Sequence, residues 1–360
     1  MCEIAFLSDK KVKIKNIFDR KFIELTGCIH NHTEYSFDCN IPVSEVIRAA
    51  KKNNLDYITI NDHRTKKAEK DIAVLEEKEL QVIVGVEIND KENNNHFLVF
   101  NSDDIMIGKS ADEYVKFYSQ QKNAVTFAAH PFERRSSNKF RKYIWTDKNN
   151  DGFDGLEIWN YLSIWLGKLK PELNGLPMIL LPSLFVKKPY RKNISYWDEL
   201  NNAGKRKAAI GSVDAHSEVF DKLGFKIKFL THNMLFKTIR TNIWLPENVE
   251  ISKENILQAL KNGNSYLVNY KVGNPYNFYA GISANGKSAV FGEEIQFQEE
   301  MKFYFRLPKI AKVKLFKNGK NIARKLDEKG FFPIETPGNY RLEITRFGRG
   351  WIYTNNIYVE

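Results

Sequence analysis

Short apolar runs recur along this chain, and a histidine or a carboxylate lies within each run or directly follows it. Runs of this kind are typical of buried strands. Helical patterns lie between them, and a strand followed by a helix, repeated, predicts a βα architecture. The runs are FIELTGCI (22–29), DYITIN (56–61), QVIVGV (81–86), HFLVF (96–100), AVTFAA (124–129), GLEIWN (155–160) and AAIGSV (208–213).

Seven such strands predict a small α/β barrel, and barrels of this kind carry their sites at the carboxyl ends of the strands. The stretch 88–95 is too short for a helical crossover, so the strand after His96 is expected to run antiparallel to its predecessor. The barrel is therefore predicted to be distorted. Helices are expected at 44–52, 65–78, 110–121 with a Ser110/Glu113 capping box, 196–203, and from Ser252 to Gly263.

Two regions depart from this pattern. Residues 159–207 contain several prolines and basic clusters, which favours a solvated loop-and-helix excursion over a functional lid. From about Pro275, short strands alternate with turns such as Asn285-Gly286, which predicts a small all-β sandwich. The predicted organisation is a lead-in at 1–21, a barrel with its closing helix at 22–272, and an accessory sandwich at 273–360.

Composition excludes several classes of protein. A hydrophobic fraction of 42% over 360 residues argues for a globular chain with a large core. The net charge is +11, but residues 301–360 hold 13 Lys/Arg against 5 Asp/Glu, so charge does not indicate a nucleic-acid-binding active site. Cys2, Cys28 and Cys39 lack metal or disulfide spacing, which favours a reducing compartment. With neither a signal peptide nor a membrane span evident, we expect a cytoplasmic protein without a membrane partner.

The stretch TGCIHNHTEYSFD at 26–38 places three candidate metal ligands within nine residues. If residues 22–29 form a strand, His30 and His32 project from one side of the chain just past its end, because side chains alternate. Six of the seven histidines lie at strand ends, and imidazole with carboxylate suits zinc, iron or manganese. His232 lacks such neighbours in the sequence and is interpreted as structural. The candidate ligands are His30, His32, Asp38, His63, Glu87, His96, His130, Asp214 and His216.

These motifs resemble the PHP superfamily, the metal-dependent hydrolase domains named for polymerase and histidinol phosphatase. The resemblance rests on HNHTEYSFD (30–38), ITINDH (58–63), GVEI (85–88), AHP (129–131), GLEIWN (155–160) and GSVDAH (211–216). It spans roughly residues 22–245. The segment WDELNNAGKRKAAIGSVDAH, and LKNGNSYLVN followed by a β-rich tail, also resemble a subgroup with a C-terminal sandwich. The implied fold is a distorted (β/α)7 barrel of the PHP type followed by that sandwich.

The resemblance implies a trinuclear site that holds three divalent ions, zinc, manganese or iron. His30, His32, Glu87 and Asp214 would hold one ion. Glu87 would bridge to a second ion bound by His96 and His130. Asp38, His63 and His216 would hold the third, and Asp62 would orient a ligand or the backbone.

The implied activity is hydrolysis by a water that bridges two ions and loses its proton near neutral pH. Arg64, Arg134 and Arg135 follow ligand motifs and are candidates for binding a phosphate group, so the leading hypothesis is a phosphoesterase acting on a small anionic substrate. A carboxyl or carbamate ester hydrolase on the same site is the alternative. An inactive PHP binding module is a third, and the role of the basic C-terminal region stays open.

Overall fold

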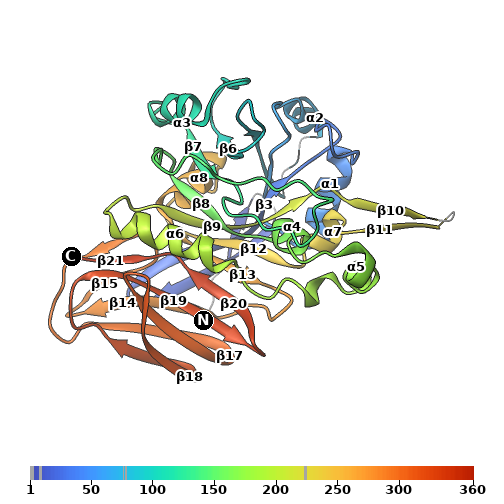
Figure 1. Ribbon diagram of the computed structural model, residues 1–360. Coiled ribbons are helices and arrows are strands. Elements are labelled where there is room, and N and C mark those ends of the chain that lie inside the picture. Colours follow the sequence, from blue (N-terminus) through green and yellow to red (C-terminus); the bar gives the residue numbers. More distant parts are fainter. Residues whose placement is uncertain (1–3, 8–9, 76, 78, 223–224) are drawn as a thin grey trace.

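The computed structural model describes residues 4–7, 10–75, 77, 79–222 and 225–360 (Figure 1). The predicted lead-in forms strands: β1 (Ile4–Leu7) pairs with β2 (Lys10–Ile17), which pairs antiparallel with β3 (Arg20–Asn31). Strand β3 is longer at both ends than the predicted run 22–29. Its outer half belongs to this hairpin and its inner half to the barrel.

Seven strands close into a barrel, as predicted. After β3 come β4 (Tyr57–Ile60), β5 (Gln81–Ile88), β6 (Phe97–Phe100), β7 (Val125–Ala128), β8 (Gly155–Asn160) and β9 (Ala208–Ala215), and β9 pairs back onto β3. The prediction for the fourth strand is also confirmed, because β6 is antiparallel to both β5 and β7 while the other pairs are parallel.

Five helices correspond to the predicted ones: α1 (Val43–Lys52), α2 (Ala68–Leu75), α3 (Ala111–Ser119), α6 (Arg191–Asn202) and α8 (Lys253–Asn262). The Ser110/Glu113 capping box is present, and Gly263 ends α8 with a φ of 73°. Helix α2 starts later than predicted. The reason is local: Arg64 has a φ of 57°, and Thr65 Oγ1 accepts a hydrogen bond from the Lys67 amide.

The region 159–207 is the helical excursion that composition favoured. It contains α4 (Tyr161–Leu166), α5 (Pro171–Leu180), the short 3₁₀ helix η1 (Pro182–Leu184) and α6. Three further elements were not predicted: β10 (Glu218–Lys222), its partner β11 (Phe225–Phe229) and α7 (His232–Leu235). In Figure 1, β10, β11 and α5 project on the same side of the molecule. Within the described residues, no helix combines the length and apolar character needed to cross a bilayer.

The C-terminal strands are largely antiparallel and continue the barrel's hydrogen bonding. Strand β12 pairs with β3 and β13, and β13 pairs with β20. β17 and β18 are longer than the short strands expected, and β17 carries an irregularity between Arg306 and Ala311. The division into a separate sandwich stays a prediction. The strands are β12 (Ile239–Pro246), β13 (Ser265–Asn269), β14 (Tyr279–Ala284), β15 (Lys287–Ala289), β16 (Glu294–Ile295), β17 (Lys302–Lys317), β18 (Lys320–Pro333), β19 (Gly338–Arg346), β20 (Arg349–Thr354) and β21 (Ile357–Val359).

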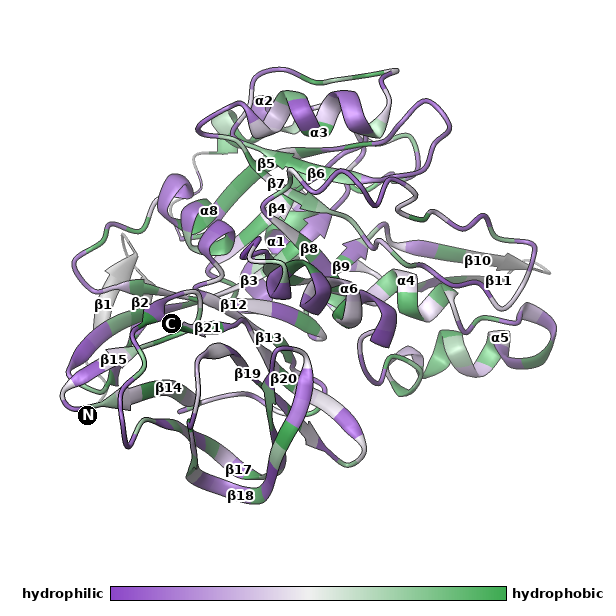
Figure 2. Ribbon diagram, turned by 60° about the vertical axis from the view of Figure 1, so that its left-hand side comes forward, coloured by the Kyte–Doolittle hydropathy of each residue, from purple (hydrophilic) through white to green (hydrophobic). Residues whose placement is uncertain are grey.

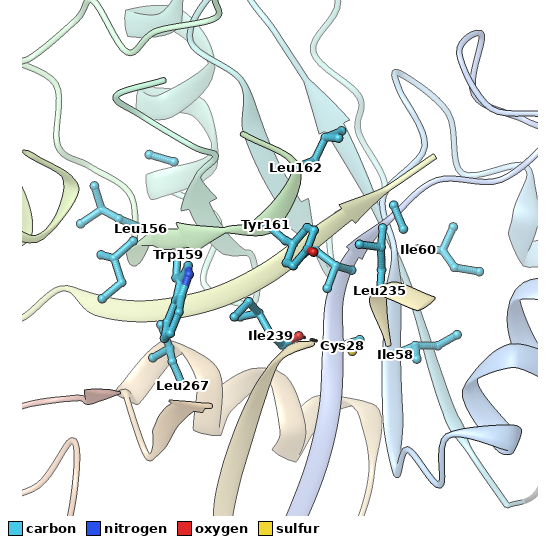
Figure 3. Close-up of a cluster of buried hydrophobic side chains, with 14 of the residues drawn as sticks. Cys28, Ile58, Ile60, Leu156, Trp159, Tyr161, Leu162, Leu235, Ile239 and Leu267 are labelled. Carbon is cyan, nitrogen blue, oxygen red and sulfur yellow. Dashed lines mark hydrogen bonds between the residues drawn. The ribbon is translucent and has the colours of Figure 1, made fainter. Parts of the chain in front are cut away.

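Alternate residues of the barrel strands pack into different cores. Leu25 and Ile29 of β3 belong to a cluster that includes Leu257 and Leu260 of α8, whereas Cys28 belongs to a second cluster. Figure 3 shows this second cluster, in which Cys28 lies near Ile58 and its thiol donates to the carbonyl of Ile239. Cys28 and Cys39 are free thiols, and Cys2 lies outside the described residues.

A third core joins the C-terminal strands to strands that precede them in the chain. Trp244 of β12 stacks on Phe291 with ring centroids 4.8 Å apart, and Tyr266 of β13 contacts Phe278 at 4.8 Å. Val268 is buried in the same cluster. Residues from both sides of the predicted boundary at 272 therefore share one hydrophobic core.

This shared core predicts that a chain ending at residue 272 will not fold stably. Truncation would expose Trp244, Tyr266 and Val268, whose burial is worth about 1.5–3 kcal/mol each, so the loss approaches the roughly 5–15 kcal/mol that stabilises a typical domain. Thermal unfolding followed by circular dichroism is the measurement. A truncated chain that melts cooperatively within a few degrees of the full chain would show an independent barrel domain instead.

Candidate metal centre

The nine candidate ligands converge on one end of the barrel. His30, Glu87 and Asp214 lie within the carboxyl-terminal residues of β3, β5 and β9, and His63 and His130 follow β4 and β7. His96 precedes β6, yet it reaches the same end because β6 runs in the opposite direction. The antiparallel strand thus supplies a ligand from its amino end.

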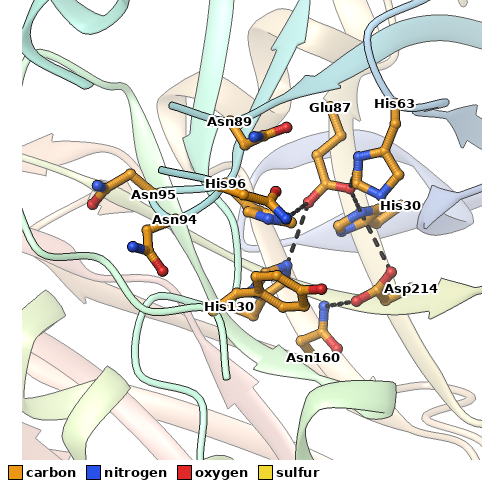
Figure 4. Close-up of polar contacts among 12 residues, drawn as sticks. His30, His63, Glu87, Asn89, Asn94, Asn95, His96, His130, Asn160 and Asp214 are labelled. Carbon is orange, nitrogen blue, oxygen red and sulfur yellow. Dashed lines mark hydrogen bonds and ion pairs between the residues drawn. The ribbon is translucent and has the colours of Figure 1, made fainter. Parts of the chain in front are cut away.

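Glu87 lies at the centre of this group (Figure 4). Its Oε2 atom is 3.1 Å from His30 Nε2, 3.4 Å from His32 Nε2 and 3.3 Å from His63 Nδ1. Its Oε1 atom is 2.8 Å from His96 Nδ1 and 3.3 Å from His130 Nε2. Five imidazoles therefore approach one carboxylate, three at one oxygen and two at the other.

Two further carboxylates extend the cluster. Asp214 Oδ1 is 3.5 Å from His30 Nε2 and 3.4 Å from His32 Nε2. Asp38 Oδ2 is 3.2 Å from His63 Nε2 and 3.3 Å from His216 Nε2. The ligand atoms of His32, Asp38, His63 and His216 all lie within 4.8 Å of one another, as do those of His30, His32 and Glu87, and those of His63, Glu87 and His96.

The residues fit divalent metal ions. Five buried imidazole nitrogens have no hydrogen-bond partner among the described residues, although a buried polar atom without a partner is costly. Imidazole nitrogen and carboxylate oxygen are the donors that zinc, iron and manganese accept. These nitrogens are His30 Nε2, His32 Nε2, His63 Nδ1, His96 Nε2 and His130 Nδ1.

The electrostatics favour the ligating forms of Glu87 and His32, whereas in His130 the effect of burial is outweighed by Glu133 and Glu87, which raise its pKa to about 9. Burial raises the pKa of Glu87, but the fields of His30, His63 and His96 outweigh it and hold the pKa well below its usual range. Burial, followed by the charge of His216, lowers the pKa of His32 to about 3. At neutral pH Glu87 is therefore an anion and His32 a neutral imidazole.

Three ligands occupy the left-handed backbone region: His30 has a φ of 66°, His130 of 30° and Asp214 of 55°. Residues held in this region cost about 1–3 kcal/mol each and persist only where their surroundings enforce them. The expectation that His30 lies past the end of a regular strand is wrong, because β3 runs to Asn31 with a register irregularity after Ile29. Even so, the rings of His30 and His32 meet, with centroids 5.0 Å apart.

Glu157 and Asn160 of β8 hold all three of these ligands. Glu157 accepts a hydrogen bond from His30 Nδ1 at 2.8 Å and from the His130 amide at 2.9 Å. Asn160 Nδ2 lies 3.0 Å from Glu157 and 3.2 Å from Asp214 Oδ2. The sequence analysis did not include either residue in the site, although a carboxylate inside the apolar run GLEIWN was a signal for it.

Asp62 and His232 hold the backbone of the first ligand loop. Asp62 accepts hydrogen bonds from the amide and hydroxyl of Thr33 at 2.6 and 2.7 Å. His232 Nε2 donates to the His32 carbonyl at 3.0 Å, and its Nδ1 accepts from Ser217 at 2.9 Å. Because Ser217 follows His216, His232 ties two ligand segments together.

A cavity of about 260 Å³ opens over the ligands. Arg135 lines it, and its Nη2 is 2.7 Å from Glu133. Arg64 instead donates to Asn89, and Arg134 stacks over Tyr190. Neither of these two arginines is among the residues that line the cavity.

Part of the cavity wall is aromatic and apolar, which sequence reasoning missed. Phe37 is 81% exposed and its ring lies 4.9 Å from that of His63. Tyr143 lies 4.6 Å from the ring of His96, and Leu162 and Leu166 of α4 complete this wall. Phe37 lies inside the motif HNHTEYSFD, but Tyr143, Leu162 and Leu166 lie in no motif, and the role of all four depends on where the loops and α4 are placed.

A family model described as the PHP domain matches residues 29–156. The matched segment contains seven of the nine candidate ligands and ends before Asp214 and His216. The PHP match and the ligand clusters together support a metal-dependent hydrolase.

A solved structure is also similar to part of this chain. It is described as a putative metal-dependent phosphoesterase from Bifidobacterium adolescentis. The sequence identity is 14% and the TM-score 0.33, over 56% of this chain and 92% of the other. None of the curated proteins matches the sequence.

The contacts of Glu157 predict that Glu157→Gln lowers metal affinity roughly 10–100-fold, since a residue that orients a metal-binding histidine typically has this effect. Metal binding to the stripped protein, measured by calorimetry, is the readout. Glu24→Gln is the matched control, because Glu24 is a buried carboxylate paired with Lys15 at 2.6 Å, away from the cluster. Equal metal affinities for Glu157→Gln and the native chain would contradict the prediction.

Proposed function

We propose that this chain is a metal-dependent hydrolase that cleaves phosphate esters at a trinuclear site. The observation that supports it most is the arrangement around Glu87, where five imidazoles surround one buried carboxylate at the open end of a PHP barrel. A structural role alone does not explain five buried imidazole nitrogens that form no hydrogen bond among the described residues.

The distances suggest how three ions would share the ligands. His30, His32, Glu87 and Asp214 would hold one ion, since the two imidazoles lie 3.1–3.5 Å from both carboxylates. Glu87 Oε1, His96 and His130 would hold the second ion. Asp38, His63 and His216 would hold the third.

When bound, such ions acidify a water molecule and stabilise the negative charge that develops on the group under attack. The protein supplies position and environment. Glu157 and Asn160 fix the ligands, Arg135 offers a cation beside a phosphoryl oxygen, and the wall formed by Phe37, Leu162 and Leu166 would contact the leaving group and restrict water.

The trinuclear assignment predicts that Glu87→Gln and Asp38→Asn lower the number of bound metal ions by different amounts. Glu87→Gln should remove at least two ions per chain, because both of its oxygens face imidazoles, whereas Asp38→Asn should remove one at most. Elemental analysis after gel filtration gives the stoichiometry. The two changes are mutual controls, since each replaces a carboxylate by an amide. Equal losses, or a native chain that binds fewer than three ions when saturated, would refute the trinuclear assignment.

A carboxyl or carbamate ester hydrolase is the second candidate, and one observation favours it. Arg135 already pairs with Glu133, so the cation that the cavity offers to a phosphate is partly neutralised. The apolar wall would suit an uncharged ester. Against this, the Arg135 Nε is buried without a hydrogen bond among the described residues, which leaves a donor for an anion.

Arg135→Met separates these two candidates. If the substrate is a phosphate ester, catalytic efficiency on a phosphomonoester should fall roughly 10–100-fold, since a charge-assisted contact is worth about 1.5–3 kcal/mol, while a neutral aryl ester is little affected. Arg134→Met is the control, because Arg134 stacks on Tyr190 outside the cavity. A native enzyme that cleaves only neutral esters would establish the alternative, and a metal-loaded chain without any hydrolysis would establish the inactive binding module.

The remaining expectations are part of this proposal. The metals would be zinc, manganese or iron, the substrate a small anionic ester, and the location cytoplasmic. The division of the chain near residue 272 stays a prediction, and the core shared across that position argues against a barrel that folds without the C-terminal strands.

A further inference from the structure

Five leucines on α5 and η1 face solvent. The exposed fractions of Leu173, Leu176 and Leu180 are 80, 62 and 60%, and those of Leu181 and Leu184 are 57 and 52%. Single exposed leucines are normal in soluble proteins, but a contiguous group of this size marks a binding surface. Figure 2 shows α5 at the edge of the molecule with much of its ribbon coloured hydrophobic.

The spacing places the helix leucines on one face. Leu173, Leu176 and Leu180 are separated by three and four residues, so they follow one stripe of α5. Met178 and Ile179 of the same helix are buried against the protein. Helix α5 therefore has an apolar face toward the core and a second apolar face toward solvent.

The stripe continues into a groove of about 340 Å³ next to η1. Leu180, Leu181 and Leu184 line this groove together with Leu230 and Met234. We call the five exposed leucines, Leu173, Leu176, Leu180, Leu181 and Leu184, the leucine surface.

Lysines border the leucine surface. Lys237 and Lys271 line the groove and are exposed, and neither forms an ion pair with a carboxylate in the described part of the chain. Burial, followed by the charges of Lys237 and Arg349, lowers the pKa of Lys271. Lys168, on the same excursion, has its pKa lowered by burial and then by Lys187. The groove end of the leucine surface is thus positive, while Glu172 at the start of α5 is paired with Lys139.

We propose that the leucine surface docks on an anionic lipid bilayer. Apolar side chains flanked by lysines are the combination that binds at the headgroup boundary, where leucines enter the acyl region and lysines meet anionic headgroups. A second copy of the chain fits less well, because two-fold pairing of this face would bring two positive borders together. An α5 of ten residues lies along such a surface and does not cross it.

This docking would bring the metal centre to the lipid boundary. Helix α4, which begins the same excursion, contributes Leu162 and Leu166 to the cavity above the ligands. The sequence alone predicts no membrane partner, because no membrane span is evident and the exposed leucines lie in the segment 159–207, which is interpreted as a solvated loop-and-helix excursion. The proposal does not depend on the reaction at the metal centre.

The test is co-sedimentation of the full-length, metal-loaded protein with vesicles. Vesicles that contain phosphatidylglycerol should bind the native protein, and vesicles of phosphatidylcholine alone should bind it much less. Changing Leu173, Leu176 and Leu180 together to Ser should weaken binding roughly 10–100-fold, because each apolar insertion is lost. Lys237→Glu with Lys271→Glu should abolish the preference for the anionic lipid.

Leu326→Ser is the matched control, since Leu326 is 75% exposed but lies on β18, outside the leucine surface. This variant should bind vesicles like the native protein. Metal content and melting temperature of the triple variant verify that it is folded. Absence of binding by the native protein, or binding unchanged by the three Ser substitutions, would overturn the proposal. Concentration-dependent dimerisation that the three Ser substitutions abolish, without vesicle binding, would assign the surface to self-association instead.

Discussion

One buried carboxylate constrains the rest of this molecule. Glu87 is 1% exposed, and a charge in that position is tolerated only when opposite charges or strong donors surround it. The barrel meets this requirement by bringing imidazoles from β3, β4, β6 and β7 to within 3.4 Å of its two oxygens. In the described part of the chain, five of the buried imidazole nitrogens in this arrangement form no hydrogen bond, which leaves them available as ligands for metal ions. Metal binding and stability of the barrel end are therefore coupled.

The ligands with strained backbone conformations are held by hydrogen bonds with the same two residues. His30, His130 and Asp214 adopt left-handed backbone conformations that single residues outside a site rarely keep. All three are held by Glu157 and Asn160, from a strand that contributes no ligand of its own. Strand β8 thus positions ligands that other strands and loops carry. Positioning of this kind is what a metal site requires, since ligand directions must be set before an ion binds.

The C-terminal strands support the outside of the barrel. β12 pairs with β3 on one edge and with β13 on the other, and Trp244 and Tyr266 belong to the core beneath the later strands. Arg341 of β19 also reaches α6, with its Nη1 atom 2.6 Å from Asp198. The strand that carries His30 is consequently supported by the C-terminal region, which links the accessory strands to the site through hydrogen bonding and packing.

The sequence by itself determined the repeated strands, the closed barrel, the reversed β6 and the set of candidate ligands, because these depend on local periodicity and on residue types that follow each strand. It also indicated the capping box of α3 and the glycine that ends α8. Only the tertiary structure decided which residues support the ligands, which of the three arginines lines the cavity, and that leucines of α5 face solvent. Glu157 reads as an interruption of an apolar run, and Arg64, Arg134 and Arg135 are indistinguishable in the sequence. Their differences arise from contacts between segments far apart in the chain, and such contacts follow from packing, which no local pattern encodes.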